Sequence, residues 1–101
     1  MTQEYNTELL KEVLITFGGD NQIDMMVEEA SELLNALMKF KRERATAMDV
    51  LEEVADVQIM CAQMEMYFER FRGIRKASTK MMRKYKMDRL AMRLADYKDK
   101  K

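Results

Sequence analysis

Two short acidic segments hold the side chains of this sequence that are best suited to chemistry. Residues 28–32 read EEASE and residues 52–56 read EEVAD. In each segment a Glu precedes a second carboxylate by three residues (Glu29 and Glu32, Glu53 and Asp56), so on a helix each pair shares one face. Like charges at this spacing repel, and a hard cation such as Mg²⁺ relieves the repulsion because it binds carboxylate oxygens. One such segment is typical of a solvated helix face, whereas two together favour a metal site.

The composition leaves carboxylates as the only metal-binding chemistry. The chain has no His, and Cys61 is its only Cys. These facts exclude a disulfide within the chain, the usual zinc sites and acid–base catalysis by His. Cys61 stands among apolar residues and is expected to be inert core.

Length and residue usage indicate one all-α domain over residues 1–101. Pro is absent, Gly occurs three times, and strong helix formers dominate. A chain of 101 residues buries a limited core, so association with a second copy is expected. No apolar run approaches the ~20 residues of a membrane span and no signal peptide opens the chain, so we expect a cytoplasmic protein without a membrane partner.

The first half of the chain predicts two helices. Apolar residues recur every three to four positions over residues 5–17, and Gly18 with Gly19 is expected to end that helix. Asn21 is a favourable N-cap for a second helix that runs to about Arg44.

The second half predicts two more helices. Thr46, with Asp49 three residues later, resembles a capping box and predicts a third helix that runs to Arg72. A fourth helix is expected from residue 74 or 75, and the polar residues 96–101 are expected to fray.

Helical periodicity selects Glu29 and Glu53 as the carboxylates that point inward. Both interrupt an apolar strip, and an unpaired carboxylate in such a position is costly unless it is protonated or metal-bound. Glu28 and Glu52 lie on more polar strips. The apolar neighbours on the strips of Glu29 and Glu53 are Met26, Leu33, Ala36, Phe40, Val50, Val57, Met60, Met64 and Phe71.

The two segments are also expected to lie at one height. If the second helix ends near Glu43 and the third begins near Ala47, Glu32 and Asp56 each lie roughly 15 Å from the turn. A short connection favours antiparallel neighbours. Four carboxylates would then converge between the two helices.

The pattern Glu28-Glu29-x-x-Glu32, followed after 20 residues by Glu53-x-x-Asp56, resembles the MazG-like all-α nucleoside triphosphate pyrophosphohydrolases. Gln22 and Ile23 upstream, Leu33 and Val57 also fit, and the resemblance covers about residues 20–94. It implies a four-helix-bundle fold that assembles as a homodimer or homotetramer. It also implies Mg²⁺-dependent cleavage of a (deoxy)nucleoside triphosphate between the α- and β-phosphates, with Mn²⁺ as a possible substitute.

The resemblance assigns roles to the acidic residues. Glu29, Glu32, Glu53 and Asp56 would be metal ligands, and Glu28 would be an auxiliary carboxylate that binds another ion or orients the water. Either Glu28 or Glu53 would take the proton of the attacking water. The preferred base and sugar stay open, as does the choice between house-cleaning and control of a nucleotide pool.

Charge is strongly divided along the chain. Residues 1–69 carry 15 acidic and 5 basic side chains, whereas residues 70–101 carry 13 basic and 3 acidic ones. Lys86, Arg89 and Arg93 follow a spacing that places them on one strip of the fourth helix. Because similar enzymes place basic residues of the last helix near the phosphates, these three are predicted to bind phosphate.

Two alternatives remain. Phosphoribosyl-ATP pyrophosphohydrolases belong to the same superfamily, but they usually carry a Tyr-His pair shortly after the second motif, and here Asp56 is followed by VQIMC. A non-catalytic helical interaction protein could bind nucleic acid through residues 70–101, yet no recognisable DNA- or RNA-binding motif is present, so nucleic acid is not an expected partner.

Overall fold

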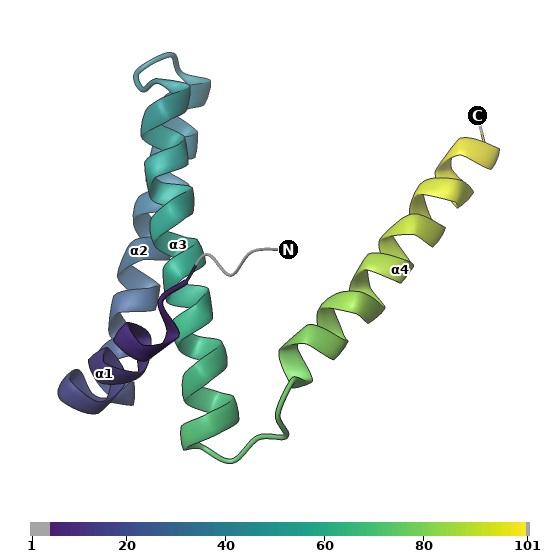
Figure 1. Cartoon of the computed structure of the whole chain (residues 1–101). Helices are drawn as coiled ribbons and strands as arrows, with labels where there is room; N and C mark the ends of the chain where they lie inside the picture. The colour runs from purple at the N-terminus through teal and green to yellow at the C-terminus, as the bar shows by residue number, and fades with distance from the viewer. Residues whose placement is uncertain (1–4, 101) are drawn as a thin grey trace.

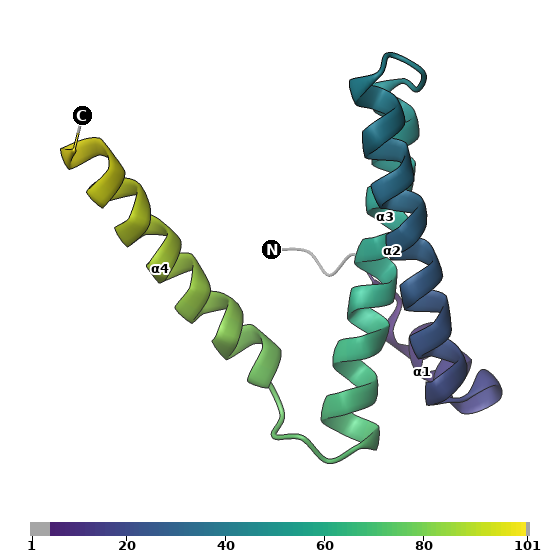
Figure 2. The same cartoon turned by 180° about the vertical axis from the view of Figure 1, so that it is seen from behind.

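The computed structural model describes residues 5–100, and these form helices without a strand. Figure 1 shows α2 and α3 side by side and antiparallel, with α1 crossing one end of the pair and α4 standing apart from it; Figure 2 shows the same arrangement from behind. The elements are α1 (Thr7–Phe17), α2 (Gly19–Lys41), α3 (Ala47–Met66), the π-helical η1 (Tyr67–Phe71) and α4 (Ser78–Asp99). The all-α class predicted from the sequence is confirmed for this part of the chain.

The connection between α2 and α3 is short because both helix ends are well defined. At the start of α3 the Thr46 N–H donates to Asp49 Oδ2 at 2.8 Å, and the Asp49 N–H donates to Thr46 Oγ1 at 3.1 Å. This is the capping box predicted from the sequence. The preceding helix ends at Lys41 rather than near Arg44, and Glu43 turns the chain with a φ of 59°.

The start of α2 differs from the prediction. The helix begins at Gly19 with Gly18 as its N-cap, so Asn21 lies inside the helix and caps nothing. Gly18 makes this possible because its φ of 89° turns α1 directly into α2. A Cβ at Gly19 would overlap the ring of Tyr67, so the close approach of η1 to α2 depends on a glycine there.

The core lies where α1 crosses the α2–α3 pair. Leu10 and Leu14 of α1 are buried with Met66 at the end of α3. Tyr5, Ala62 and Tyr67 pack against this group. The cluster is small, and it anchors the end of the hairpin opposite to the α2–α3 connection.

The segment from α3 to α4 also departs from the prediction. The α-helical part of α3 ends at Met66, and the chain reaches Arg72 through the π-helical turn of η1. The last helix begins at Ser78 rather than at residue 74 or 75, because Ala77 before it has a φ of 68°. It continues to Asp99, so residues 96–99 are helical and the predicted fraying of this stretch is wrong.

One carboxylate caps the start of α4. Glu69 of η1 accepts the Ala77 N–H at 2.7 Å through one oxygen and the Thr79 N–H at 3.0 Å through the other. The first turn of a helix leaves its N–H groups without intrahelical partners, and a negative charge there is favourable. Hydrogen bonds from Thr79, followed by that from Ala77, lower the pKa of Glu69 below its ordinary 4.5.

Loss of the Glu69 charge is expected to unwind the start of α4. Because the pKa of Glu69 is lowered in the folded protein, its stabilisation is present above pH 4.5 and is lost as pH falls through the lowered pKa. Glu69→Gln should therefore show at neutral pH the reduced helicity that wild type shows only in acid, measured by circular dichroism. Glu65→Gln, on the preceding turn, is the control, and an equal loss of helicity in both variants would contradict the role of the cap.

Residues 5–100, the part of the chain that the structure describes, do not close a four-helix bundle by themselves. Every residue from 79 to 100 is exposed, and Ile59, Cys61 and Phe68 of the α3–η1 segment are exposed as well. The expectation of Cys61 as buried core is therefore wrong for the single chain. The Cα radius of gyration is 16.8 Å, whereas a compact domain of this length has about 13 Å. None of the helices within residues 5–100 combines the length and apolarity that a membrane span needs.

Candidate metal centre

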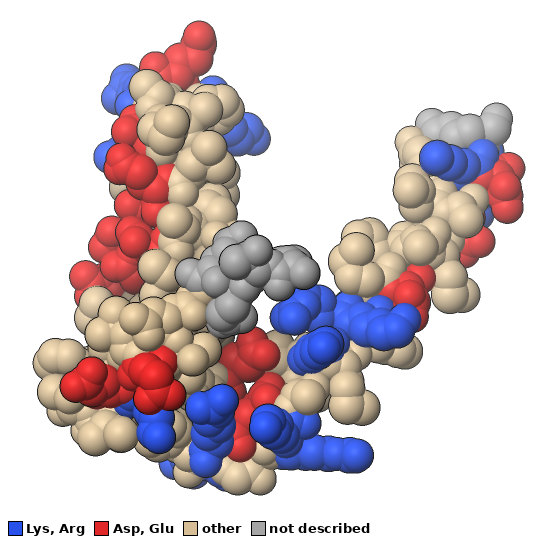
Figure 3. Space-filling view, viewed as in Figure 1, with Lys and Arg blue, Asp and Glu red and all other residues tan. Residues whose placement is uncertain are grey.

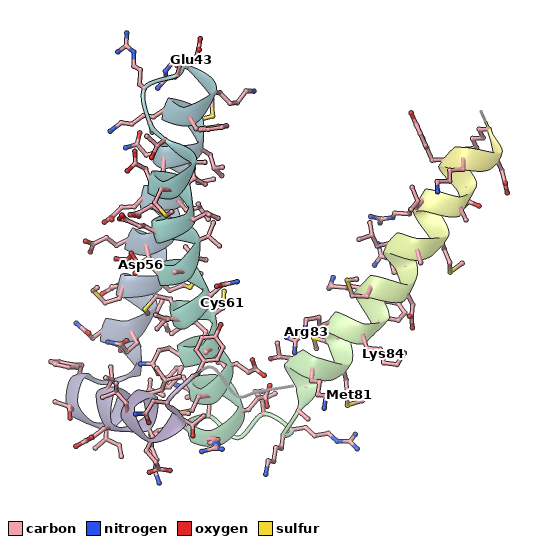
Figure 4. All side chains as sticks on the ribbon, turned by 45° about the horizontal axis from the view of Figure 1, so that its top comes forward. Glu43, Asp56, Cys61, Met81, Arg83 and Lys84 are labelled. Atoms are coloured by element: carbon pink, nitrogen blue, oxygen red, sulfur yellow. The ribbon has the colours of Figure 1, made fainter. Side chains whose placement is uncertain are left out.

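Three carboxylates converge between α2 and α3. One oxygen each from Glu29, Glu53 and Asp56 lies within 4.8 Å of the other two. Glu29 and Glu53 are half-buried and Asp56 is exposed, so the group opens to solvent on one side. Figure 4 shows Asp56 midway along the α2–α3 pair, far from Glu43 at the connection.

The two half-buried members carry oxygens without a partner. Oε2 of Glu29 and Oε2 of Glu53 are shut off from solvent, and no donor among the described residues reaches them. An unpaired buried carboxylate oxygen is unfavourable, and nearly all such groups in proteins find a hydrogen bond or a cation. These oxygens are therefore available for a ligand that brings positive charge.

Crowding of carboxylates raises the pKa of both half-buried residues. For Glu29 the main cause is burial, followed by the charges of Glu32 and Asp56, a contact with the Asp56 carboxyl, and the charge of Glu53. For Glu53 burial is again first, and the charges of Glu32, Asp56 and Glu52 follow. The folded protein thus favours protonation here, and a cation would compete with those protons.

The donor set fits a hard divalent cation. All the converging atoms are carboxylate oxygens, which are the ligands that Mg²⁺ and Mn²⁺ prefer. Mg²⁺ is commonly held by a few carboxylates while waters and substrate phosphates complete its shell. The open side of the group at Asp56 leaves room for those further ligands.

The remaining acidic residues of the two segments lie outside this group. Glu32 is exposed, yet it is close enough for its charge to raise the pKa of both Glu29 and Glu53. Glu28 and Glu52 are exposed, in agreement with the polar strips assigned to them. The structure thus brings together three of the four predicted metal ligands and places the fourth, Glu32, beside them.

A groove of about 310 Å³ runs from the carboxylates toward the α2–α3 connection. It contains two basic side chains, Lys39 and Arg44, which the sequence analysis did not single out. Their position near the predicted turn, on the side of the acidic segments, was the signal that could have found them. The groove is lined by Glu32, Asn35, Ala36, Lys39, Arg44, Ala45, Asp49, Glu52 and Glu53.

The predicted phosphate-binding residues lie on a separate arm of the molecule. Lys86, Arg89 and Arg93 share one side of α4, where they line a shallow groove with Met87 and Leu90. In Figure 3 acidic side chains follow the α2–α3 pair, whereas basic ones gather on α4 and at the lower end of the molecule. Within one chain, therefore, the predicted strip on α4 and the carboxylate group do not meet.

Comparisons of the chain with protein-family models, curated proteins and solved structures found no match. The resemblance to MazG-like enzymes rests on the motif residues alone, and the activity that it implies is a proposal.

Proposed function

We propose that the protein is a Mg²⁺-dependent nucleotide pyrophosphohydrolase that cleaves a (deoxy)nucleoside triphosphate into a monophosphate and pyrophosphate. The observation that carries this proposal is the convergence of Glu29, Glu53 and Asp56, with two oxygens shut off from solvent and unpartnered. A merely solvated acidic face would expose its carboxylates and satisfy them with water.

The acidic side chains would have two roles in the reaction, metal binding and proton transfer. Glu29, Glu53 and Asp56 would hold the cation, with Glu32 beside them. When bound, the cation would neutralise phosphate charge and lower the pKa of the attacking water. Glu28 or Glu53 would accept the proton of that water.

Positive charge for the outgoing pyrophosphate comes from two places. Lys39 and Arg44 already line the groove beside Glu32 and Glu53. Lys86, Arg89 and Arg93 would reach the phosphates of a neighbouring copy, because α4 projects from its own chain and carries the charge opposite to that of the α2–α3 pair. Arg and Lys bind phosphate through charge-assisted hydrogen bonds.

The assembly is proposed to be a homodimer or homotetramer with a MazG-like bundle at its centre. The exposed apolar side chains of α3 and α4 provide the surface for it. In such an assembly α4 of one copy would cover the α2–α3 pair of another, and each site would combine acidic and basic residues from two chains.

A panel of nucleoside triphosphates incubated with Mg²⁺ tests the activity. We expect monophosphate and pyrophosphate as products, and no orthophosphate. Omission of the metal should abolish turnover. Release of orthophosphate, or the absence of turnover with every ribo- and deoxyribonucleotide, would contradict the proposal.

A second candidate function is binding of nucleic acid without catalysis, and the exposed basic helix α4 favours it. Seven basic and three acidic side chains lie between Ser78 and Asp99. Binding through these residues would weaken steeply with salt, because it depends on release of counterions. A salt-sensitive shift in the electrophoretic mobility of RNA or DNA, caused by a protein that hydrolyses no nucleotide, would favour this alternative.

A further inference from the structure

A pair of buried amides joins α2 to α3. Gln63 is 2% exposed and Gln22 is 6% exposed, and both are buried polar side chains of the described part of the chain. The Gln63 Nε2 donates to Gln22 Oε1 at 3.1 Å, and the Gln22 Nε2 donates to Asn21 Oδ1 at 3.0 Å. The bridge thus joins residues that are 41 positions apart in the sequence.

The bridge and the carboxylates belong to the same register of the two helices. Seven residues forward from Gln22 lies Glu29, and seven residues back from Gln63 lies Asp56. In an antiparallel pair both steps cover two turns, about 10 Å, in the same direction. Glu29 and Asp56 do meet, with oxygens within 4.8 Å. The alignment that pairs the amides is therefore the one that brings the carboxylates together.

Apolar contacts alone define this register weakly. The neighbouring positions carry side chains such as Met26, Met60 and Met64, and methionine adapts its shape to different surroundings. The carboxylates oppose the observed register, since their mutual repulsion is lowest when the helices slip apart. A slip by one turn would break the bond between the Gln63 Nε2 and the Gln22 Oε1 and leave both of these buried atoms without a partner, which is unfavourable.

The hydrogen bond between Gln22 and Gln63 does not make the folded protein more stable than apolar side chains at these positions would. Oε1 of Gln63 is buried and lacks a hydrogen-bond partner among the described residues. An apolar side chain of similar length would avoid this unsatisfied atom, and a partly satisfied polar network is less favourable than apolar packing. A single buried polar pair can instead specify one alignment of packed helices.

We propose that Gln22 and Gln63 are positioning residues that fix the register of α2 against α3 and thereby hold Glu29 opposite Asp56. They act on the cation only through the carboxylates. This inference rests on the proposed function to the extent that it takes the carboxylates as metal ligands.

The test compares Mn²⁺ affinity with stability in the full-length chain. Gln63→Met and Gln22→Met each remove the bridge but leave the other buried amide without its partner, so each should melt lower. The double variant removes both amides and preserves side-chain length, so its melting temperature without metal should stay unchanged or rise. The affinity for Mn²⁺, measured by calorimetry, should fall by about tenfold or more, as when a residue that orients metal ligands is lost. The double variant should lose no more Mn²⁺ affinity than either single variant, because the bond between Gln22 and Gln63 is already absent in each of them.

Gln58→Met is the matched control, since Gln58 is exposed on the same helix and its variant should bind Mn²⁺ as wild type does. Unchanged Mn²⁺ affinity in both bridge variants would overturn the inference and leave the proposed function standing. A fall in the Mn²⁺ affinity of the double variant that only parallels a fall in its melting temperature would also overturn it. A wild-type protein that binds no Mn²⁺ would overturn the proposed function, and this inference with it.

Discussion

Glu53→Gln is expected to stabilise the metal-free protein and to remove nucleotide hydrolysis. The carboxylate of Glu53 is half-buried beside other carboxylates, and its pKa is raised by burial and by the charges of Glu32 and Asp56. A neutral amide of the same shape would remove this repulsion. It would also remove a metal ligand, which should lower the rate of hydrolysis by roughly a hundredfold or more. Mutation of a residue that only hydrogen-bonds a metal ligand already lowers metal affinity or activity by about 10- to 100-fold.

The stability effect of Glu53→Gln should depend on pH. Because the pKa of Glu53 is raised above its ordinary 4.5, its favourable contribution is present below pH 4.5 and is lost as pH rises through the raised pKa. Wild type and Glu53→Gln should thus melt at similar temperatures in acid, and the variant should melt higher at neutral pH. Added Mg²⁺ should raise the melting temperature of wild type but not that of Glu53→Gln.

Glu52→Gln is the control for Glu53→Gln. Glu52 is adjacent in sequence and equally acidic, but it is exposed and is the last of the contributors to the raised pKa of Glu53. Its replacement should change hydrolysis and metal response little. Kinetics in which Glu52→Gln is as damaging as Glu53→Gln would show that the wrong carboxylate is assigned to the metal.

Light scattering at micromolar concentration is expected to give at least twice the 12.0 kDa mass of the chain. All residues of α4 from Thr79 onward are exposed, whereas most of the stability of a helix in a protein comes from packing one of its faces against other elements. Leu90 is 56% exposed on the side of α4 that carries Arg89 and Arg93. A second copy would bury this side, and its acidic α2–α3 pair has the complementary charge.

Leu90→Glu is therefore expected to dissociate the assembly, because it places a negative charge in the apolar part of that interface. The variant should scatter as a monomer, lose part of its helical signal and lose hydrolysis. Ala95→Glu adds the same charge on the opposite side of α4 and should leave the mass unchanged. A wild-type monomer, or an oligomer that tolerates Leu90→Glu, would contradict this arrangement of α4.

The sequence by itself determined the features that depend on neighbours three or four residues apart. The capping box of Thr46 and Asp49 is such a feature, because both of its hydrogen bonds close within one turn. The inward placement of Glu29 and Glu53 follows in the same way from helical periodicity, since the interruption of an apolar strip is visible without a partner helix. Four helices follow from the same signals.

Local signals failed where backbone geometry or a distant ring decides the outcome. Asn21 has the chemistry of an N-cap, yet the positive φ of Gly18 starts the helix at Gly19, and the ring of Tyr67 leaves no room for a side chain there. Likewise α4 does not begin at residue 74 or 75, because Glu69 caps the N–H groups of Ala77 and Thr79. The contacts of Tyr67 with Gly19 and of Glu69 with Ala77 and Thr79 join residues of different elements, and helical periodicity within one element does not predict such contacts.

Only the tertiary structure decided the register of the two acidic segments. Counting from the turn places Glu32 level with Asp56, whereas the structure places Glu29 there and leaves Glu32 exposed beside the group. The observed ends of the two helices would still place Glu32 level with Asp56, so the difference of nearly one turn lies in the alignment that the bond between Gln22 and Gln63 fixes. Register depends on side-chain contacts between residues far apart in the sequence, and no local pattern contains that information.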